Sequence, residues 1–152
     1  MKLSEALVLR ADTQRRIQRL RERLKLSAIT QEGEQPPEDP QELLSELDRL
    51  LGQLQDLIAR INHTNAASTL EPGVTLTNAI AGRDILRLRF SVLSDMADSA
   101  SQIVDRYRPT ELRKIPTIDV AALRRQLDAI AEQERELDTA IQAANWSTEL
   151  EE

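Results

Sequence analysis

Apolar residues recur at alternating spacings of three and four along four stretches of the chain, the pattern of a helix that buries one side. The second stretch shows it most clearly, with apolar residues at Leu43, Leu47, Leu50, Leu54, Leu57 and Ile61. The pattern predicts helices over residues 3–27, 40–64, 76–104 and 119–144. Apolar positions sustained over several heptads are typical of coiled-coil-like packing. We therefore predict an all-α fold, an elongated antiparallel four-helix bundle made of coiled-coil-like helical hairpins, as one domain over residues 1–152.

Polar residues with helix-capping chemistry mark where these helices begin. The acidic, Pro-rich segment 31–39 has no apolar periodicity and is predicted to be a linker. Asp39 fits the N-cap of the second helix, with Pro40 in the first helical position and Glu42 completing a capping box. The same reasoning makes Thr75 and Asp119 the N-caps of the third and fourth helices.

The composition excludes most catalytic and metal chemistry. The chain has no Cys, one His (His63) and three aromatic residues (Phe90, Tyr107 and Trp146). No disulfide, thiolate site or multi-His metal site is possible with these residues, and no Glu-x-x-His motif of a carboxylate di-metal bundle is present. We expect no catalytic residue, no metal and no cofactor, and a capping or surface role for His63 at a helix end.

Charge is segregated along the chain. Residues 1–30 carry a net charge of +5, and residues 31–56 carry −7. We expect the basic first helix to pair with an acidic helix of this chain or of a neighbour. The alternative is a first helix that binds a membrane or a nucleic acid in a salt-dependent way. No apolar run is long enough for a membrane span and no signal peptide is recognisable, so we predict a cytoplasmic protein with neither kind of partner.

Three charged residues occupy positions where the helical pattern calls for apolar ones: Arg10, Arg83 and Glu134. A buried charge is costly unless it is paired, so we predict one buried polar network in which Glu134 opposes one or both arginines. Asp84 is a further candidate member. Such a network fixes helix register or oligomeric state, or it lines an anion-binding pocket; an arginine at the edge of the stripe can also extend to solvent.

A second group of charged and aromatic residues lies in the connection between the third and fourth helices. It includes Arg106, Tyr107 and Glu111. Together with Arg83 and Asp84 these residues form the candidate ligand site, in which arginines would clamp a small anion and a carboxylate would serve as base. The alternative is a solvated charged loop.

The segments 46–71 and 126–151 resemble each other when they are aligned with an offset of 80 residues. Both contain an Asn near the helix end, Asn65 and Asn145, followed five residues later by Leu-Glu. We predict that both helices end in the same Asn-containing turn, with Asn145, Trp146 and Leu150 anchoring the C-terminal tail. Duplication and convergence both remain open.

Several stretches resemble the septicolysin-like family of uncharacterised small helical bacterial proteins over essentially the whole chain. The more specific matches are INHTN (61–65), GRD (82–84) and NWSTEL (145–150). The resemblance implies a small helical bacterial protein and supplies no catalytic residues. The family name implies a thiol-dependent lysin, but the chain has no Cys and no apolar segment that would insert into a membrane.

These observations favour a self-associating, coiled-coil-like helical protein with a binding or scaffolding role, forming a homo-oligomer. The alternative is a small-anion-binding protein or enzyme that uses the candidate ligand site around Arg83 and Arg106–Glu111.

Overall fold

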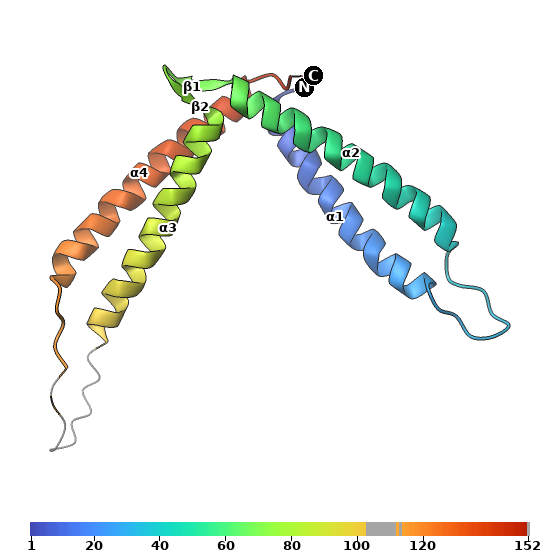
Figure 1. The fold of residues 1–152 in the computed structure, drawn as a ribbon, viewed down its shortest axis with the longest axis horizontal. Helices are drawn as coiled ribbons and strands as arrows, with labels where there is room; N and C mark the ends of the chain where they lie inside the picture. The colour runs from blue at the N-terminus through green and yellow to red at the C-terminus, as the bar shows by residue number, and fades with distance from the viewer. Residues whose placement is uncertain (103–111, 113, 152) are drawn as a thin grey trace. The chain divides into compact units, whose positions relative to one another are not determined.

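A computed structural model describes residues 1–102, 112 and 114–151. Within them lie four helices, α1 (Leu3–Ser27), α2 (Pro40–Ala67), α3 (Leu76–Ser101) and α4 (Val120–Ser147), and a two-stranded sheet of β1 (Thr69–Glu71) and β2 (Val74–Thr75) (Figure 1). The all-α prediction is confirmed. Each helix begins within one residue of its predicted start.

The described chain divides into two compact units. The first unit comprises Met1–Thr69 and Ala143–Glu152, and the second comprises Leu70–Gln142. The first is built on the α1/α2 hairpin and the second on the α3/α4 hairpin. The last residues of α4 belong to the first unit because the C-terminal tail docks there.

The predicted caps are present. Asp39 accepts a hydrogen bond from the Gln41 amide at 2.8 Å, and Pro40 follows it in the first helical position. Thr75 accepts from the Asn78 amide at 3.2 Å, and Asp119 accepts from the Ala122 amide at 3.0 Å. These bonds satisfy amides that have no partner within the helix. The reciprocal capping contact that was predicted at Glu42 occurs instead in α1, where Glu5 accepts from the Lys2 amide at 2.7 Å.

The core of the α1/α2 hairpin is aliphatic, as the shortage of aromatic residues requires. Leu20, Leu43 and Leu50 form a buried cluster, around which Ile17, Leu24 and Leu47 pack. At the edge of the cluster the Arg23 guanidinium binds the carboxylates of Glu38 and Glu46. The hydrogen bond from Arg23 lowers the pKa of Glu38. The basic first helix thus pairs, at this point, with acidic residues of its own chain.

The two ends of the chain are held together in a contact that we call the terminal clasp, formed by residues 1–3 and 148–150. The Leu3 amide donates to the Thr148 carbonyl at 2.9 Å, and the Leu150 amide donates to the Met1 carbonyl at 2.8 Å. Between these bonds, Lys2 and Glu149 pair as antiparallel extended residues, and the Lys2 Nζ lies 2.6 Å from the Glu149 carboxylate. Hydrogen bonds from Lys2 and from the terminal amine lower the pKa of Glu149.

The segment between α2 and α3, which falls between two predicted helices, contains the short β1–β2 hairpin. Its turn is Pro72–Gly73, and Gly73 has a φ of 85°. Pro before a Gly at positive φ is the chemistry of a type II turn. The prediction missed the strands because they are only three and two residues long.

The two hairpins share one plan. Helices α2 and α4 each have 28 residues, and their bounds differ by 80 positions, the offset of the sequence repeat. Each is followed by a short extended segment that pairs with the residues preceding the first helix of the other hairpin. The segment after α2 pairs with the residues before α3, and the segment after α4 pairs with the residue before α1. That helix begins in both cases with a buried Leu, followed three residues later by a buried Ala: Leu3 and Ala6 in α1, Leu76 and Ala79 in α3.

Candidate functional site

Among the described residues, the largest group of interacting charged side chains lies between α3 and α4, and we call it the Arg83 network. Its members are Arg83, Asp84 and Arg87 of α3 with Glu134 and Asp138 of α4. The Arg83 guanidinium donates to Asp84 at 2.9 Å and to Asp138 at 3.0 Å. Arg87 donates to Glu134 at 2.6 Å and to Asp138 at 3.3 Å. Asp138 therefore bridges the two arginines.

The Arg83 network is partly buried. The Arg83 side chain is 17% exposed and the Glu134 side chain 22%. Burial alone opposes the charged form of Arg83, but hydrogen bonds to Asp84 and Asp138 raise its pKa overall. Arg83 and Arg87 each bind two carboxylates, and three carboxylates face the two guanidiniums. This balance neutralises the arginines and does not leave a cationic clamp for an anion.

The pairing within the network differs from the prediction. Arg83 and Glu134 do belong to the same network, together with Asp84, but Glu134 binds Arg87 instead of Arg83. Arg10 lies in the other unit. Arg87 and Asp138 were missed, although each follows a predicted member, Arg83 or Glu134, by four residues. One turn of helix places such residues on the same face.

The other predicted members of the candidate ligand site, Arg106, Tyr107 and Glu111, lie outside the described residues. Beside the network, Arg87, Phe90, Ala131 and Glu134 line a hollow of 280 Å³. Two of these four residues, Arg87 and Glu134, are already bound to each other as an ion pair of the Arg83 network.

The tail anchor is partly as predicted. Asn145 and Leu150 are buried, but Trp146 is 68% exposed, so Trp146 does not anchor the tail within one chain. Leu150, only 8% exposed, fills that role together with the backbone bonds of the terminal clasp. The next residue continues the contact, since the Glu151 amide donates to the Thr64 hydroxyl at 3.0 Å.

His63 is a surface residue, as predicted. Its side chain is 64% exposed, and Nε2 lies 3.0 Å from the Glu151 carboxylate. Arg60, one turn earlier in α2, donates to the Glu151 carbonyl at 3.1 Å. His63 thus helps to hold the tail rather than forming part of a reactive site.

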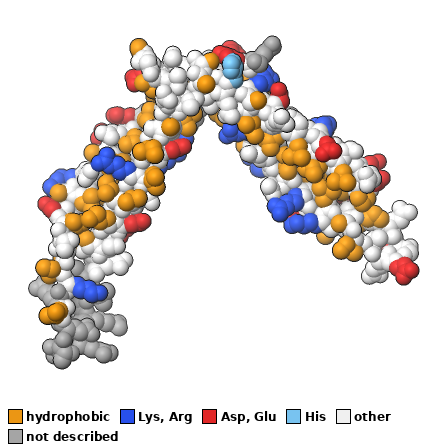
Figure 2. All heavy atoms as spheres, viewed as in Figure 1, with side chains coloured by type: hydrophobic (Ala, Val, Ile, Leu, Met, Phe, Trp, Pro, Cys, Tyr) orange, Lys and Arg blue, Asp and Glu red, His pale blue; other side chains and the backbone are white. Residues whose placement is uncertain are grey.

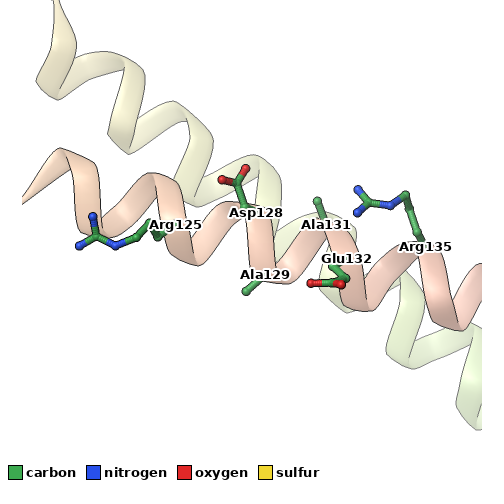
Figure 3. Close-up of a pocket in the computed structure, with 6 residues that line it drawn as sticks. All are labelled: Arg125, Asp128, Ala129, Ala131, Glu132 and Arg135. Atoms are coloured by element: carbon green, nitrogen blue, oxygen red, sulfur yellow. The ribbon is translucent and has the colours of Figure 1, made fainter.

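A hollow of 520 Å³ lies on the outer surface of α4, between Arg125 and Arg135 (Figure 3). All six residues that line it belong to this one helix, so no second element faces them across the hollow. In the described part of the chain, no group of three or more His, Cys, Asp or Glu residues is placed to hold a metal ion. Nor does any described helix have the length and hydropathy needed to span a membrane.

Two rows of large apolar side chains remain accessible on the helices, and Figure 2 shows hydrophobic side chains gathered along both hairpins. The first row is on α2, where Leu44, Leu51 and Ile58 are 43%, 45% and 38% exposed. The second is on α3 and consists of Ile85, Leu88, Val92 and Met96, which are 46–63% exposed. These rows are more unusual than the hollows, because single exposed apolar residues are normal but contiguous rows mark contact surfaces.

The comparisons with known proteins agree with the fold and leave the function open. Over 99% of both chains, the protein is 40% identical to a functionally unknown conserved protein from Corynebacterium diphtheriae, whose crystal structure matches with a TM-score of 0.94. No curated protein matches the chain. Residues 10–150 match the model of a family described as a family of unknown function (DUF6847). The chain belongs to this family.

Proposed function

We propose that this protein is a self-associating helical module with a binding or scaffolding role, in which a second copy covers the apolar face of the α1/α2 hairpin. We define the α1/α2 apolar face as Leu44, Leu51 and Ile58, which are exposed, with the half-buried Leu47, Leu54, Ile17 and Leu24 beside them. The observation that carries the proposal is the row of Leu44, Leu51 and Ile58 at intervals of seven residues along α2.

Helix geometry explains why this row stays open within one hairpin. The apolar residues of α2 form three columns along the helix. One column, which consists of Leu43, Leu50 and Leu57, is buried. The exposed column, which starts at Leu44, lies about 100° further round the helix. A single neighbouring helix covers only one side, so α1 cannot bury both columns. A helix from another hairpin would cover the second, as in a four-helix bundle.

The energetics of apolar burial also favour covering the exposed column of α2 with a helix from another hairpin. A helical hairpin buries too little apolar surface to be very stable alone. Removing a Leu or Ile side chain from water contributes about 1.5–3 kcal/mol when burial is complete. Three such residues at heptad spacing on one helix, flanked by four more apolar positions, supply the driving force for association.

The charged side chains support this function better than small-anion binding. Binding of a small anion requires unpaired guanidiniums. Those of Arg83 and Arg87, however, bind carboxylates of their own hairpin. The resemblance to the septicolysin-like proteins stays a prediction, since the family match carries no known function.

The experiment is light scattering coupled to size-exclusion chromatography on the double variant Leu51→Asp/Ile58→Asp. Its control is Leu26→Asp, which places the same charge on a residue of α1 that is 70% exposed and lies outside the apolar face. Circular dichroism verifies that both variants keep their helices. We expect the wild type and Leu26→Asp to have the mass of an oligomer, and the double variant to have the mass of one chain.

Two results would count against the proposal. One is a wild-type mass of a single chain across the accessible concentration range. The other is an unchanged oligomer mass for the folded double variant, which would show that the α1/α2 apolar face is not the contact.

A further inference from the structure

The exposed apolar row on α3, which we call the outer stripe, consists of Ile85, Leu88, Val92 and Met96. Its spacings of three and four residues place these side chains on one side of α3. The other side of α3 carries the buried Leu76, Ala79 and Ala97. Helix α3 is therefore apolar on two sides, of which the α3/α4 hairpin uses one.

Comparison with α1 shows that the outer stripe is not a general property of this fold. Aligned by their first residues, Leu3 and Leu76, the two helices differ by 73 positions. The residues of α1 equivalent to the outer stripe are Asp12, Arg15, Arg19 and Arg23, all of them charged. One hairpin thus presents a charged surface to solvent where the other presents Ile, Leu, Val and Met.

We propose that the outer stripe of α3 in a second copy packs on the α1/α2 apolar face, with α3 running parallel to α1. This inference rests on the proposed function, which requires a second copy on that face, and it names the segment that the second copy contributes. The two surfaces suit each other in width, because a single row of side chains fits between two helices.

Charges beside the two surfaces are complementary. Arg10 and Arg21 of α1 share the helix side of Ile17 and Leu24 and so border the α1/α2 apolar face. Asp84 and Asp95 border the outer stripe of α3. Eleven residues separate the members of each pair, which is three helical turns or about 16 Å. Arg10, Arg21 and Asp95 form no ion pair with other described residues.

The right-handed winding of α3 fixes its direction on the α1/α2 apolar face. With the outer stripe turned toward that face, Asp84 and Asp95 lie on the α1 side only when α3 is parallel to α1. In this direction Asp84 of the second copy is level with Arg10, and Asp95 of the second copy is level with Arg21. The opposite direction would turn both carboxylates toward α2.

The same register aligns the apolar residues. Helix α2 runs antiparallel to α1, and Leu50 packs beside Leu20. With Asp95 of the second copy at Arg21, Val92 of the second copy falls beside Leu51. Ile85 of the second copy falls beside Ile58. Charge and apolar contacts therefore select one and the same register.

A mixing experiment tests this contact, because its two surfaces are different. Leu51→Asp disrupts the face and leaves the outer stripe intact, whereas Val92→Asp does the reverse. We expect each variant alone to have the mass of one chain by light scattering. An equimolar mixture should regain a species of at least two chains, since the intact stripe of one variant meets the intact face of the other.

Other outcomes separate the failure of this inference from that of the proposed function. If Leu51→Asp alone is a monomer and Val92→Asp keeps the wild-type mass, a second copy binds the face through a different segment, and only the present inference is overturned. Two monomeric variants that do not complement each other also overturn it. A monomeric wild type overturns both.

Cysteine cross-linking gives an independent readout in this cysteine-free chain. Leu51→Cys and Val92→Cys, mixed and oxidised, should form a disulfide between the two variants in preference to either variant with itself. Mass spectrometry distinguishes the three products, because Leu and Val differ by one methylene. Leu26→Cys mixed with Val92→Cys is the control, and equal cross-linking in that mixture would contradict the contact.

Discussion

Arg10 and Arg83 are each the eighth residue of the first helix in their hairpin, but only Arg83 has a carboxylate partner among the described residues. Asp138 of α4 supplies it. The residue of α2 equivalent to Asp138, eighty positions earlier, is Ile58, which cannot accept a hydrogen bond and is partly exposed. The same position is therefore used in one hairpin for an internal ion pair and in the other for an open face bordered by an arginine.

Replacing Asp138 should destabilise the α3/α4 hairpin. Asp138→Ala leaves Arg83 partly buried without its partner on α4 and removes one of the two carboxylates that bind Arg87. Loss of charged hydrogen bonds in a partly exposed site is expected to cost about 1–2 kcal/mol. Urea unfolding followed by circular dichroism measures this cost. Asp128→Ala, at an exposed position of the same helix, is the control and should change the free energy of unfolding by less than about 0.5 kcal/mol.

The tail should depend on Leu150 and not on Trp146. Leu150→Ala removes a buried side chain from the contact between the tail and the α1/α2 hairpin and is expected to cost about 2 kcal/mol. Trp146→Ala removes a larger side chain that is mostly in water, and should cost less than about 0.5 kcal/mol. Thermal unfolding of the two variants measures the difference. A greater loss for Trp146→Ala would restore it as the anchor.

The terminal clasp should make stability depend on acid pH. The pKa of Glu149 is lowered in the folded state by Lys2 and the terminal amine, so the unfolded chain binds more protons in this range and stability rises with pH. The contribution of Glu149 is complete above the usual glutamate pKa of about 4.3 and is lost as the pH falls through its lowered folded value. The Tm difference between wild type and Glu149→Gln should therefore shrink from pH 7 to pH 3.

The control for this titration is Glu132→Gln, an exposed carboxylate on α4. Its Tm difference from the wild type should stay nearly constant over the same range. A Glu149→Gln difference that is independent of pH would show that the ion pair contributes nothing to the clasp.

Two glycine substitutions should have opposite signs. Gly73 has a φ of 85°, which disfavours any side chain, so Gly73→Ala is expected to destabilise by about 1 kcal/mol. Gly52 lies within α2 with open space around it, and Gly52→Ala should stabilise by about 0.5–1 kcal/mol through helix propensity. Unfolding free energies of the two variants test this contrast; two changes of the same sign would contradict it.

Much of the fold could be predicted from local sequence signals. Asp39, Thr75 and Asp119 begin their helices as predicted because an N-cap depends on residues only two or three positions away. The sequence repeat likewise predicted that α2 and α4 end at equivalent positions, but both helices continue two residues past Asn65 and Asn145, and no described residue other than Gly has a positive φ, so the predicted Asn-containing turn is wrong. The division into two units could not be predicted, since apolar periodicity shows that a helix has a buried side but does not identify the helix that covers it.

The candidate site was predicted less completely for a similar reason. Glu134 binds Arg87 instead of Arg83, a choice that depends on how α3 and α4 are aligned along their axes. Trp146 was expected to anchor the tail together with Leu150, but it lies in the last turn of α4 with its side chain exposed, whereas Leu150 lies in the segment after the helix and is buried. Such pairings across elements are not encoded in the spacing within one element.

The most direct test of a second copy on the α1/α2 apolar face is the mass of the wild-type chain in solution. Sedimentation equilibrium over a concentration series from micromolar to hundreds of micromolar provides it without any substitution. Self-association predicts a weight-average mass that reaches at least twice the 17.2 kDa of one chain. A mass of 17.2 kDa throughout the series would contradict it.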